Sequence, residues 1–462
     1  LNFYAPEGGV AVMKSGYNKN DSFVWIDGDN QMMNSNQEEQ HQGEFIFESR
    51  GELLLFTHGR VSTTDFDVPE YWKTPFPDPG FYGGPNLGWS WLSSSAQHNI
   101  YLIDGYGQKM SIVTTPYSAF EERPDPAYLR QMLTADNFGF VESDMYYGAV
   151  SEIGDNITIN RNFLFPNRDY LIVIDKIDGN KQHNYTNQLH IGEPKATIAE
   201  VGALSVSDNR FTLQTPRNLN LYGYFITPDN LNMQFIDTNK SIYYGGGDSN
   251  YHHYHLRSYI KTTDTDFINI LIPRFTTETQ PTVTTLSATG GKAGQIQIGK
   301  GAGASTEIVT LKEADEVSTN KVKTDAEISF VRDPNPLEYF FIKNGSYFVY
   351  NGIEYFNSSR PIMTFFNYSI GEIVGNIELI NGSAFDAVNI TLYTETLPIN
   401  LTVNSSLLSF TQDGPYITFE TSTFGPVHID KLPKDIAPPT INVAFNKSIS
   451  NIFGNDVINA TF

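Results

Sequence analysis

The stretch that decides the fold is SSSAQHNIYLIDGYGQK, residues 93–109. An apolar run starts directly after His98 and Asn99 and stops at Asp104-Gly105. The run predicts a short strand, and Asp-Gly is a pair that tight hairpin turns with positive φ angles favour. A histidine and an asparagine are unusual residues to place in front of a strand, so the question is what these two side chains contact.

Strand-like segments recur on both sides of this stretch. Many show period-2 alternation of apolar and polar residues and are broken by Gly, Asp or Asn, which is typical of strands. The 32 Phe, 26 Tyr and 4 Trp residues favour strands as well. Clear examples are GVAVMKSGY (9–17), SFVWIDGD (22–29), GEFIFESRGELLLF (43–56), ITINRNFLF (157–165), YLIVIDKI (170–177) and DFINILIP (266–273).

The length of 462 residues suggests two or three domains. We expect an all-β fold in which residues 1–325 form a large antiparallel β-sandwich. Residues 326–432 are again rich in strand patterns and predict a smaller β-rich domain. Residues 433–462 predict a tail with one or two strands, whose start is stiffened by Pro438-Pro439.

Three stretches depart from the strand pattern. Residues 62–92 are rich in Pro, Gly and aromatic residues, and this length without periodicity predicts a functional loop or lid. AYLRQMLTAD from Ala127, after a capping-box pattern at Ser118–Glu121, predicts a short helix. The Gly-rich residues 287–304 predict a flexible or bulged loop. Within them, Gly294–Lys300 is similar to part of a phosphate loop but lacks its Ser/Thr and its strand-to-helix context, so we expect no nucleotide site.

Composition excludes several classes of function. The formal net charge of −22 argues against nucleic acid as a partner, because phosphate binding needs basic patches. It also disfavours strongly anionic polysaccharides unless basic residues cluster locally or cations intervene. The absence of cysteine excludes thiolate metal sites and cysteine nucleophiles. We find no apolar run long enough to span a membrane and no signal peptide, and the start at Leu1 suggests a processed chain.

Acceptor motifs for N-glycosylation are dense, and most of them lie after residue 340. An Asn- and Thr-rich surface is the alternative interpretation. We favour a secreted protein, extracellular or at the cell surface, that carries covalent N-glycans. The candidate asparagines are Asn20, Asn156, Asn184, Asn239, Asn344, Asn357, Asn367, Asn381, Asn389, Asn400, Asn404, Asn446 and Asn459.

The run AQHNIYLIDGYGQ (96–108) resembles the HNTVxVDGxxQ signature of the C-terminal β-sandwich of heparinase II/III-like polysaccharide lyases. Other segments resemble further landmarks of this family in the same order. The resemblance covers residues 1 to about 290 well and extends more weakly to about 430. These segments are YAPEGGVAVMKSGY (4–17), QEEQHQGEFIFESRGELLL (37–55), NRNFLFPNRDYLIVIDKIDG (160–179), QLHIGEP (188–194) and DFINILIPRF (266–275).

The resemblance implies cleavage of uronic-acid-containing polysaccharides by β-elimination. A base removes the proton α to the uronate carboxylate, an acid, often Tyr, protonates the leaving oxygen, and a neutralising group stabilises the transition state. In the family the substrate lies between an N-terminal α/α toroid, which usually supplies key residues, and this sandwich. The given sequence corresponds to the β part alone, so we expect the toroid to have been cleaved off or to be carried elsewhere.

The same resemblance points to catalytic candidates. Tyr71 and Tyr82 lie in the aromatic loop, where the family places residues that face the substrate. They could instead stack on sugar rings or pack in the protein. His98 and Asn99 complete the catalytic candidates.

A metal site is a further possibility. At the positions of the family's HxHxD motif this chain has Gln37, Glu39 and His41. Among the residues that correspond to metal-binding positions of the family, only His98 is unchanged. Glu39, His41, His58 and His98 could rebuild a site for zinc or calcium, because zinc takes three or four His, Asp or Glu ligands. The alternative is that the histidines are hydrogen-bonded and fix strand ends, so that His98 holds the start of its strand.

Other histidines are weaker candidates. In YHHYH, residues 251–255, His253 and His255 would share a strand face, with His252 on the other. Two ligands do not make a metal site, and an exposed or stacked polar strand is the alternative. His190 matches a family histidine for which we expect a structural role.

Two functions remain open from the sequence. The chain is the β part of a secreted polysaccharide lyase, or a lyase-type sandwich reused as a non-catalytic, glycosylated surface or filament protein. The altered HxHxD motif, the acidic charge and the dense glycosylation motifs favour the second, which would bind glycans or self-assemble through its tail.

Overall fold

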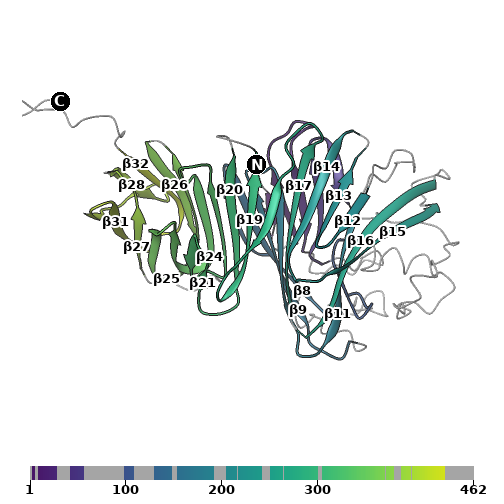
Figure 1. Cartoon of the computed structure of the whole chain (residues 1–462). Coiled ribbons are helices and arrows are strands. Elements are labelled where there is room, and N and C mark those ends of the chain that lie inside the picture. The colour runs from purple at the N-terminus through teal and green to yellow at the C-terminus, as the bar shows by residue number, and fades with distance from the viewer. Residues whose placement is uncertain are drawn as a thin grey trace, which may run out of the picture.

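The computed structural model describes the chain as a series of stacked β-sheets, and no helix occurs among the described residues (Figure 1). The predicted all-β fold class is therefore confirmed. The described residues are 3–5, 9–28, 42–56, 98–108, 129–147, 153–191, 204–215, 217–241, 250–263, 265–299, 304–369, 371–378, 387–396 and 398–431.

Sheet A contains nine strands within the described residues, in the order β1-β2-β3-β4-β5-β11-β16-β15, and β6 pairs with β11 beside this path. All its pairings are antiparallel. The strands are β1 (Phe3–Ala5), β2 (Val10–Lys14), β3 (Phe23–Asp27), β4 (Glu44–Ser49), β5 (Glu52–Leu55), β6 (Tyr101–Ile103), β11 (His183–Ile191), β15 (Asn232–Ser241) and β16 (Asn250–Thr262).

Sheet B has eight strands in the described part of the chain, in the order β12-β13-β14-β17-β10-β9-β8-β7, again antiparallel. The strands are β7 (Leu129–Ala135), β8 (Phe138–Tyr146), β9 (Thr158–Pro166), β10 (Leu171–Asp178), β12 (Leu204–Ser207), β13 (Arg210–Gln214), β14 (Leu219–Thr227) and β17 (Thr265–Phe275).

Sheet C holds the remaining described strands and branches at β25. Residues 363–369 of this strand pair with β26, whereas residues 356–358 pair with β27. Apolar residues of both branches meet in one cluster, so sheet C has a core of its own. Its strands are β18 (Thr282–Leu286), β19 (Gly291–Ile298), β20 (Ser305–Lys312), β21 (Val317–Ser318), β22 (Val322–Thr324), β23 (Ile328–Asp333), β24 (Tyr339–Tyr350), β25 (Ile353–Ser369), β26 (Glu372–Glu378), β27 (Val388–Tyr393), β28 (Pro398–Val403), β29 (Ser406–Leu407), β30 (Thr411–Asp413), β31 (Tyr416–Thr421) and β32 (Gly425–Lys431).

Sheet B is the middle layer, and Figure 1 shows it between sheet A on the right and sheet C on the left. Leu171 and Val173 of β10 belong to the core that sheets A and B share. Ile172 and Ile174 belong to the core between sheets B and C. A strand that is buried on both faces has no polar side, which explains the unbroken apolar run at the start of β10.

The expected hairpin turn after β6 is confirmed. Asp104 and Gly105 have φ angles of 52° and 86°. The main chains of Ile103 and Tyr106 exchange two hydrogen bonds of 2.9 Å across them. Positive φ at both central residues is the geometry of the turn that the Asp-Gly pair favours.

His183 ties this turn to a neighbouring loop. Its Nδ1 lies 2.6 Å from Asp104 Oδ2 and its Nε2 lies 3.2 Å from Asp155 Oδ2. Burial by itself would raise the pKa of Asp155. The hydrogen bonds that Asn180, Asn156 and His183 make to its carboxylate outweigh burial and hold the pKa well below its usual value.

The predicted helix near Ala127 is wrong over its described part. Residues 129–135 form β7, with a buried, exposed, buried alternation at Leu129, Arg130 and Gln131. The strand forms a hairpin with β8. Leu, Gln, Met and Ala are good helix formers, but cross-strand pairing and burial against two cores override this weak preference. The capping-box pattern lies outside the described residues.

The prediction of a Gly-rich loop is wrong for residues 291–298, which form β19 between β18 and β20. A Cβ added at Gly294 would lie 2.8 Å from Cγ1 of Ile226 on β14. The glycine thus permits sheets B and C to approach closely, rather than making the chain flexible.

Sheet C begins at Thr282 and ends at Lys431. The predicted domain boundaries at residues 325 and 432 stay predictions, as does the strand content of the tail, which lies outside the described residues. Among the described residues, none belongs to a helix of the length and apolarity that crossing a bilayer requires.

Candidate functional site

Asn99 answers the question that the sequence raised. Its amide nitrogen donates to the carbonyl oxygens of Phe45 at 2.8 Å and Phe56 at 3.1 Å. Its amide oxygen accepts a 2.7 Å hydrogen bond from the main-chain N–H of His190. The side chain is fully buried. It joins β4, the end of β5 and β11 at a place where β5 and β11 pair at a single position, Leu55 with Ile191. Asn99 is therefore a structural bridge inside sheet A.

His98 is also fully buried. Its Nδ1 lies 2.9 Å from Oε2 of Glu44, the first residue of β4. A hydrogen-bonded histidine that holds the start of its strand is the alternative that the sequence left open, and these contacts are of that kind.

A buried ion pair on sheet B contacts the main chain of the segment that contains His98 and Asn99. Arg161 on β9 donates to both carboxylate oxygens of Asp175 on β10, at 2.6 and 3.0 Å. Its Nη1 donates to the main-chain oxygens of Gly43 and Asn99 at 2.8 and 2.7 Å. Arg161, on the opposite sheet, therefore anchors the main chain of Asn99, the residue next to His98.

Electrostatics in this network follow from burial. Burial alone would lower the pKa of Arg161, but the attraction of Asp175 outweighs it and raises the pKa. The hydroxyl of Tyr101 donates to Asp175 at 2.8 Å. Burial, followed by the charge of Asp175, raises the pKa of Tyr101 well above its ordinary value. Tyr101 thus remains a neutral hydrogen-bond donor.

A row of polar side chains lies on the face of sheet A that points away from the core. In the antiparallel ladder of β11 and β16, His190 stands opposite His255 and Gln188 stands opposite Arg257. Their exposed fractions are only 0–3%. The alternate residues Leu189 and Leu256 belong to the core on the other face.

We call Gln188, His190, His255 and Arg257 the polar face of sheet A. The rings of His190 and His255 are 5.3 Å apart between centroids and inclined by 31°. The Glu44–His98 pair adjoins Asn99 in sequence, and the side chain of Asn99 accepts a hydrogen bond from the main-chain N–H of His190. Two imidazoles and a guanidinium thus lie on one strand face in a chain that carries a net charge of −22. Buried groups of this kind can stabilise a nearby negative charge electrostatically.

Of the predicted catalytic and metal-site residues, only His98 and Asn99 are among the described residues. Tyr71, Tyr82, Glu39, His41 and His58 lie outside the described residues, so the catalytic tyrosines and the metal site stay predictions. Within the described part of the chain, no group of three His, Asp or Glu residues is arranged to hold a metal ion. From the sequence we also expect the rings of His98 and His41 to face one shallow basin, and this stays a prediction because His41 lies outside the described residues.

Sequence reasoning missed Glu44, Gln188 and Arg257. Period-2 alternation in YTNQLHIG and HYHLRSYI places Gln188 beside His190 and Arg257 beside His255 on one strand face. The sequence alone could therefore have indicated which residues share a strand face. It could not indicate the register of β11 and β16 that brings the two pairs together.

Neither the models of known protein families nor the curated proteins give a match to this chain. Among solved structures, it is similar to a heparinase III, with 12% identity, a TM-score of 0.48 and coverage of 68% of this chain and 42% of the other. Heparan sulfate lyase from Pedobacter heparinus gives 14%, 0.48, 68% and 43% for the same quantities. Chondroitin AC lyase from Streptomyces coelicolor gives 8%, 0.38, 67% and 37%.

The chain thus spans less than half the length of these lyases. At these identities and TM-scores the similarity is one of fold, and nothing about activity or substrate follows from it.

Proposed function

We propose that this chain is the β-sandwich part of a secreted, heparinase II/III-like polysaccharide lyase that binds a uronic-acid-containing polysaccharide. The observation that carries the proposal is the polar face of sheet A, which lies beside the motif AQHNIYLIDGYGQ. It concentrates basic side chains at one place on an acidic protein. A local basic cluster is the condition under which such a protein can bind an anionic chain.

The chemistry of β-elimination assigns roles to these groups. Arg257 and the imidazoles of His190 and His255 are buried, so they act as fixed charges and dipoles beneath the surface where a uronate carboxylate binds. Groups held in place in this way stabilise developing charge without having to reorganise. Tyr71 and Tyr82 are the proposed proton-transfer residues, following the family resemblance.

Binding tests this proposal directly. We expect the chain to be retarded in native gels that contain heparan sulfate, chondroitin sulfate or polygalacturonate, and the retardation to weaken in the Arg257→Met variant. Arg210→Met, at an exposed arginine of β13 on sheet B, is the matched control. Equal migration of both variants in all three gels would remove the polar face as the binding site.

Catalysis requires a separate assay. The absorbance of unsaturated uronate products should rise when the chain acts on one of these polysaccharides together with a toroid piece. Loss of this signal in Tyr71→Phe or Tyr82→Phe, with binding retained, would identify the proton donor. Binding without product in every combination would contradict the lyase activity.

A second candidate is a non-catalytic, glycosylated surface or filament protein built on the same sandwich. It is favoured by the burial of His98 and Asn99, because hydrogen bonds of both side chains go to neighbouring strands of sheet A. Electron microscopy and analytical ultracentrifugation of native material would show polymers. A strictly monomeric species would remove the assembly version.

Secretion and glycosylation belong to both candidates, and the exposure of several acceptor asparagines supports the glycosylation. Treatment of native material with peptide N-glycosidase should increase its electrophoretic mobility, and an unchanged mobility would contradict the glycosylation. Candidate asparagines that are exposed in the structure are Asn20, Asn156, Asn357, Asn389, Asn400 and Asn404.

A further inference from the structure

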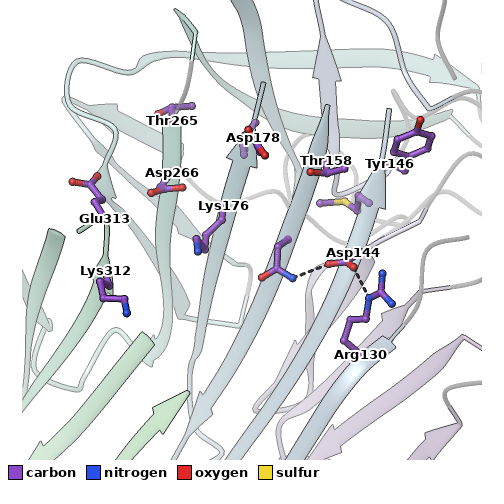
Figure 2. A pocket seen from close by; sticks show the side chains of 13 residues that line it. Arg130, Asp144, Tyr146, Thr158, Lys176, Asp178, Thr265, Asp266, Lys312 and Glu313 are labelled. Atoms are coloured by element: carbon purple, nitrogen blue, oxygen red, sulfur yellow. Dashed lines mark hydrogen bonds and ion pairs between the residues drawn. The ribbon is translucent and has the colours of Figure 1, made fainter. Parts of the chain in front are cut away.

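A polar pocket of about 710 Å³ opens between sheets B and C, away from the polar face of sheet A (Figure 2). Its floor is one transverse row of side chains on neighbouring strands of sheet B. Antiparallel register places Lys176 beside Asp266 and Asn160, and places Asp144 on the other side of Asn160. Arg130 on β7 ends the row. The volume is in the range of pockets that bind small ligands.

The floor is held in place by its own contacts. Asp144 accepts hydrogen bonds from Arg130 Nε at 2.5 Å and from Asn160 Nδ2 at 2.7 Å, which Figure 2 shows as dashed lines. Lys176 Nζ lies 2.8 Å from Glu327 Oε1 on the sheet C side. Side chains fixed in this way are preorganised, which reduces the entropy that ligand binding costs.

Donors and acceptors alternate along the floor. Neighbouring strands lie roughly 4.8 Å apart, which is about the width of one sugar ring. Over this distance the floor changes from a donor side chain to an acceptor side chain. Lys312, Asp178 and Glu313 also line the pocket. Together with Lys176, Arg130, Asp144 and Asp266 they give three cations and four carboxylates.

This charge pattern selects the ligand class. A polyanion would meet more carboxylates than cations, and an apolar ligand would remove charged side chains from water without replacing that hydration. Hydroxyl groups both donate and accept, so a chain of neutral sugars satisfies the alternating row. Thr158, Thr265 and Tyr146 add further hydroxyls to the lining.

We propose that the pocket between sheets B and C is a carbohydrate site for a neutral, hydroxyl-rich oligosaccharide. It is distinct from the anionic-glycan surface proposed on sheet A, and it does not depend on lyase activity. The same protein would thus hold an uncharged glycan between sheets B and C and an acidic one on its other side.

Isothermal titration calorimetry of the full chain tests the site. The probes are neutral hexasaccharides of glucose, mannose, galactose and xylose, with hexagalacturonate as an anionic probe of equal length. We expect at least one neutral probe to bind, and Asp178→Ala or Lys176→Met to weaken its binding about tenfold, which is the effect of one good hydrogen bond to a charged group. Asp413→Ala, at an exposed carboxylate of β30, should leave binding unchanged.

Each other outcome overturns the proposal. If no neutral probe binds, or if binding is equal in all three variants, the pocket is not the site. If hexagalacturonate competes with the neutral probe and binds more tightly, the ligand class is wrong. Asp178 is exposed and lies at the end of β10, so its replacement leaves the fold intact, and thermal unfolding of each variant checks this.

Discussion

Replacement of Asn99 by alanine should destabilise the sandwich of sheets A and B strongly. The change removes three buried hydrogen bonds, of 2.8, 3.1 and 2.7 Å. Each contributes about 1 kcal/mol net, and a buried N–H of His190 left without its acceptor adds up to about 2 kcal/mol. We therefore expect a loss of about 3–5 kcal/mol in the free energy of unfolding.

Amide hydrogen exchange is the suitable assay, because peptides that cover β6 and β11 report the free energy of opening at this place. Asn99→Asp should be at least as destabilising as Asn99→Ala. It keeps the acceptor for His190 but sets a carboxylate against two carbonyl oxygens. Asn232→Ala, at an exposed asparagine of β15, is the control and should change stability by less than about 0.5 kcal/mol.

A loss below about 1 kcal/mol in Asn99→Ala would refute this reasoning. The side chain would then be dispensable to the three strands that it joins, and burial of the His98-Asn99 pair would need a different explanation. Protection should otherwise fall in β6 and β11 and stay unchanged in strands β26–β32, because their core cluster contains residues of sheet C only.

Three further predictions concern the layers and the loop of the sandwich. Arg161→Met should cost about 3–5 kcal/mol in urea unfolding because it leaves Asp175 buried without its ion-pair partner. The double change with Asp175→Leu should recover only the part of this loss that the isolated carboxylate causes, because the carbonyl oxygens of Gly43 and Asn99 still lack the donor Arg161; no recovery would contradict this. Gly294→Ala should cost about 1–3 kcal/mol because its Cβ would lie 2.8 Å from Ile226, and a neutral effect would mean that sheets B and C separate freely. The folded-state pKa of Asp155 is depressed, so its carboxylate stabilises the fold above its unfolded pKa of about 3.8 and loses this effect as pH falls below that value. The difference in unfolding free energy between the wild type and Asp155→Asn should therefore shrink between pH 5 and pH 2. Urea titrations at several pH values would show this change.

The candidate site was only partly accessible from the sequence. The motif around His98 and Asn99 marked a polar cluster, and alternation could have added Gln188 and Arg257. Nothing in the sequence indicated that Arg161, on a strand of the other sheet, holds the main chain of Asn99. Contacts between residues 62 positions apart depend on how the two sheets stack.

Local chemistry was enough for the features that depend on neighbours in sequence. The Asp104-Gly105 turn, the strands that precede and follow it and the all-β class follow from backbone preferences and from side chains alternating between two environments.

Only the tertiary structure decided the rest. Residues 129–135 form a strand because β8 pairs with them, although their intrinsic preference is helical. Gly294 marks a close contact between two sheets, a role that a glycine-rich sequence cannot show. His190 and His255 meet because the register of β11 and β16 places them opposite each other. Register, layer order and interlayer distance are set by the summed packing of many distant residues, so no short stretch of sequence contains them.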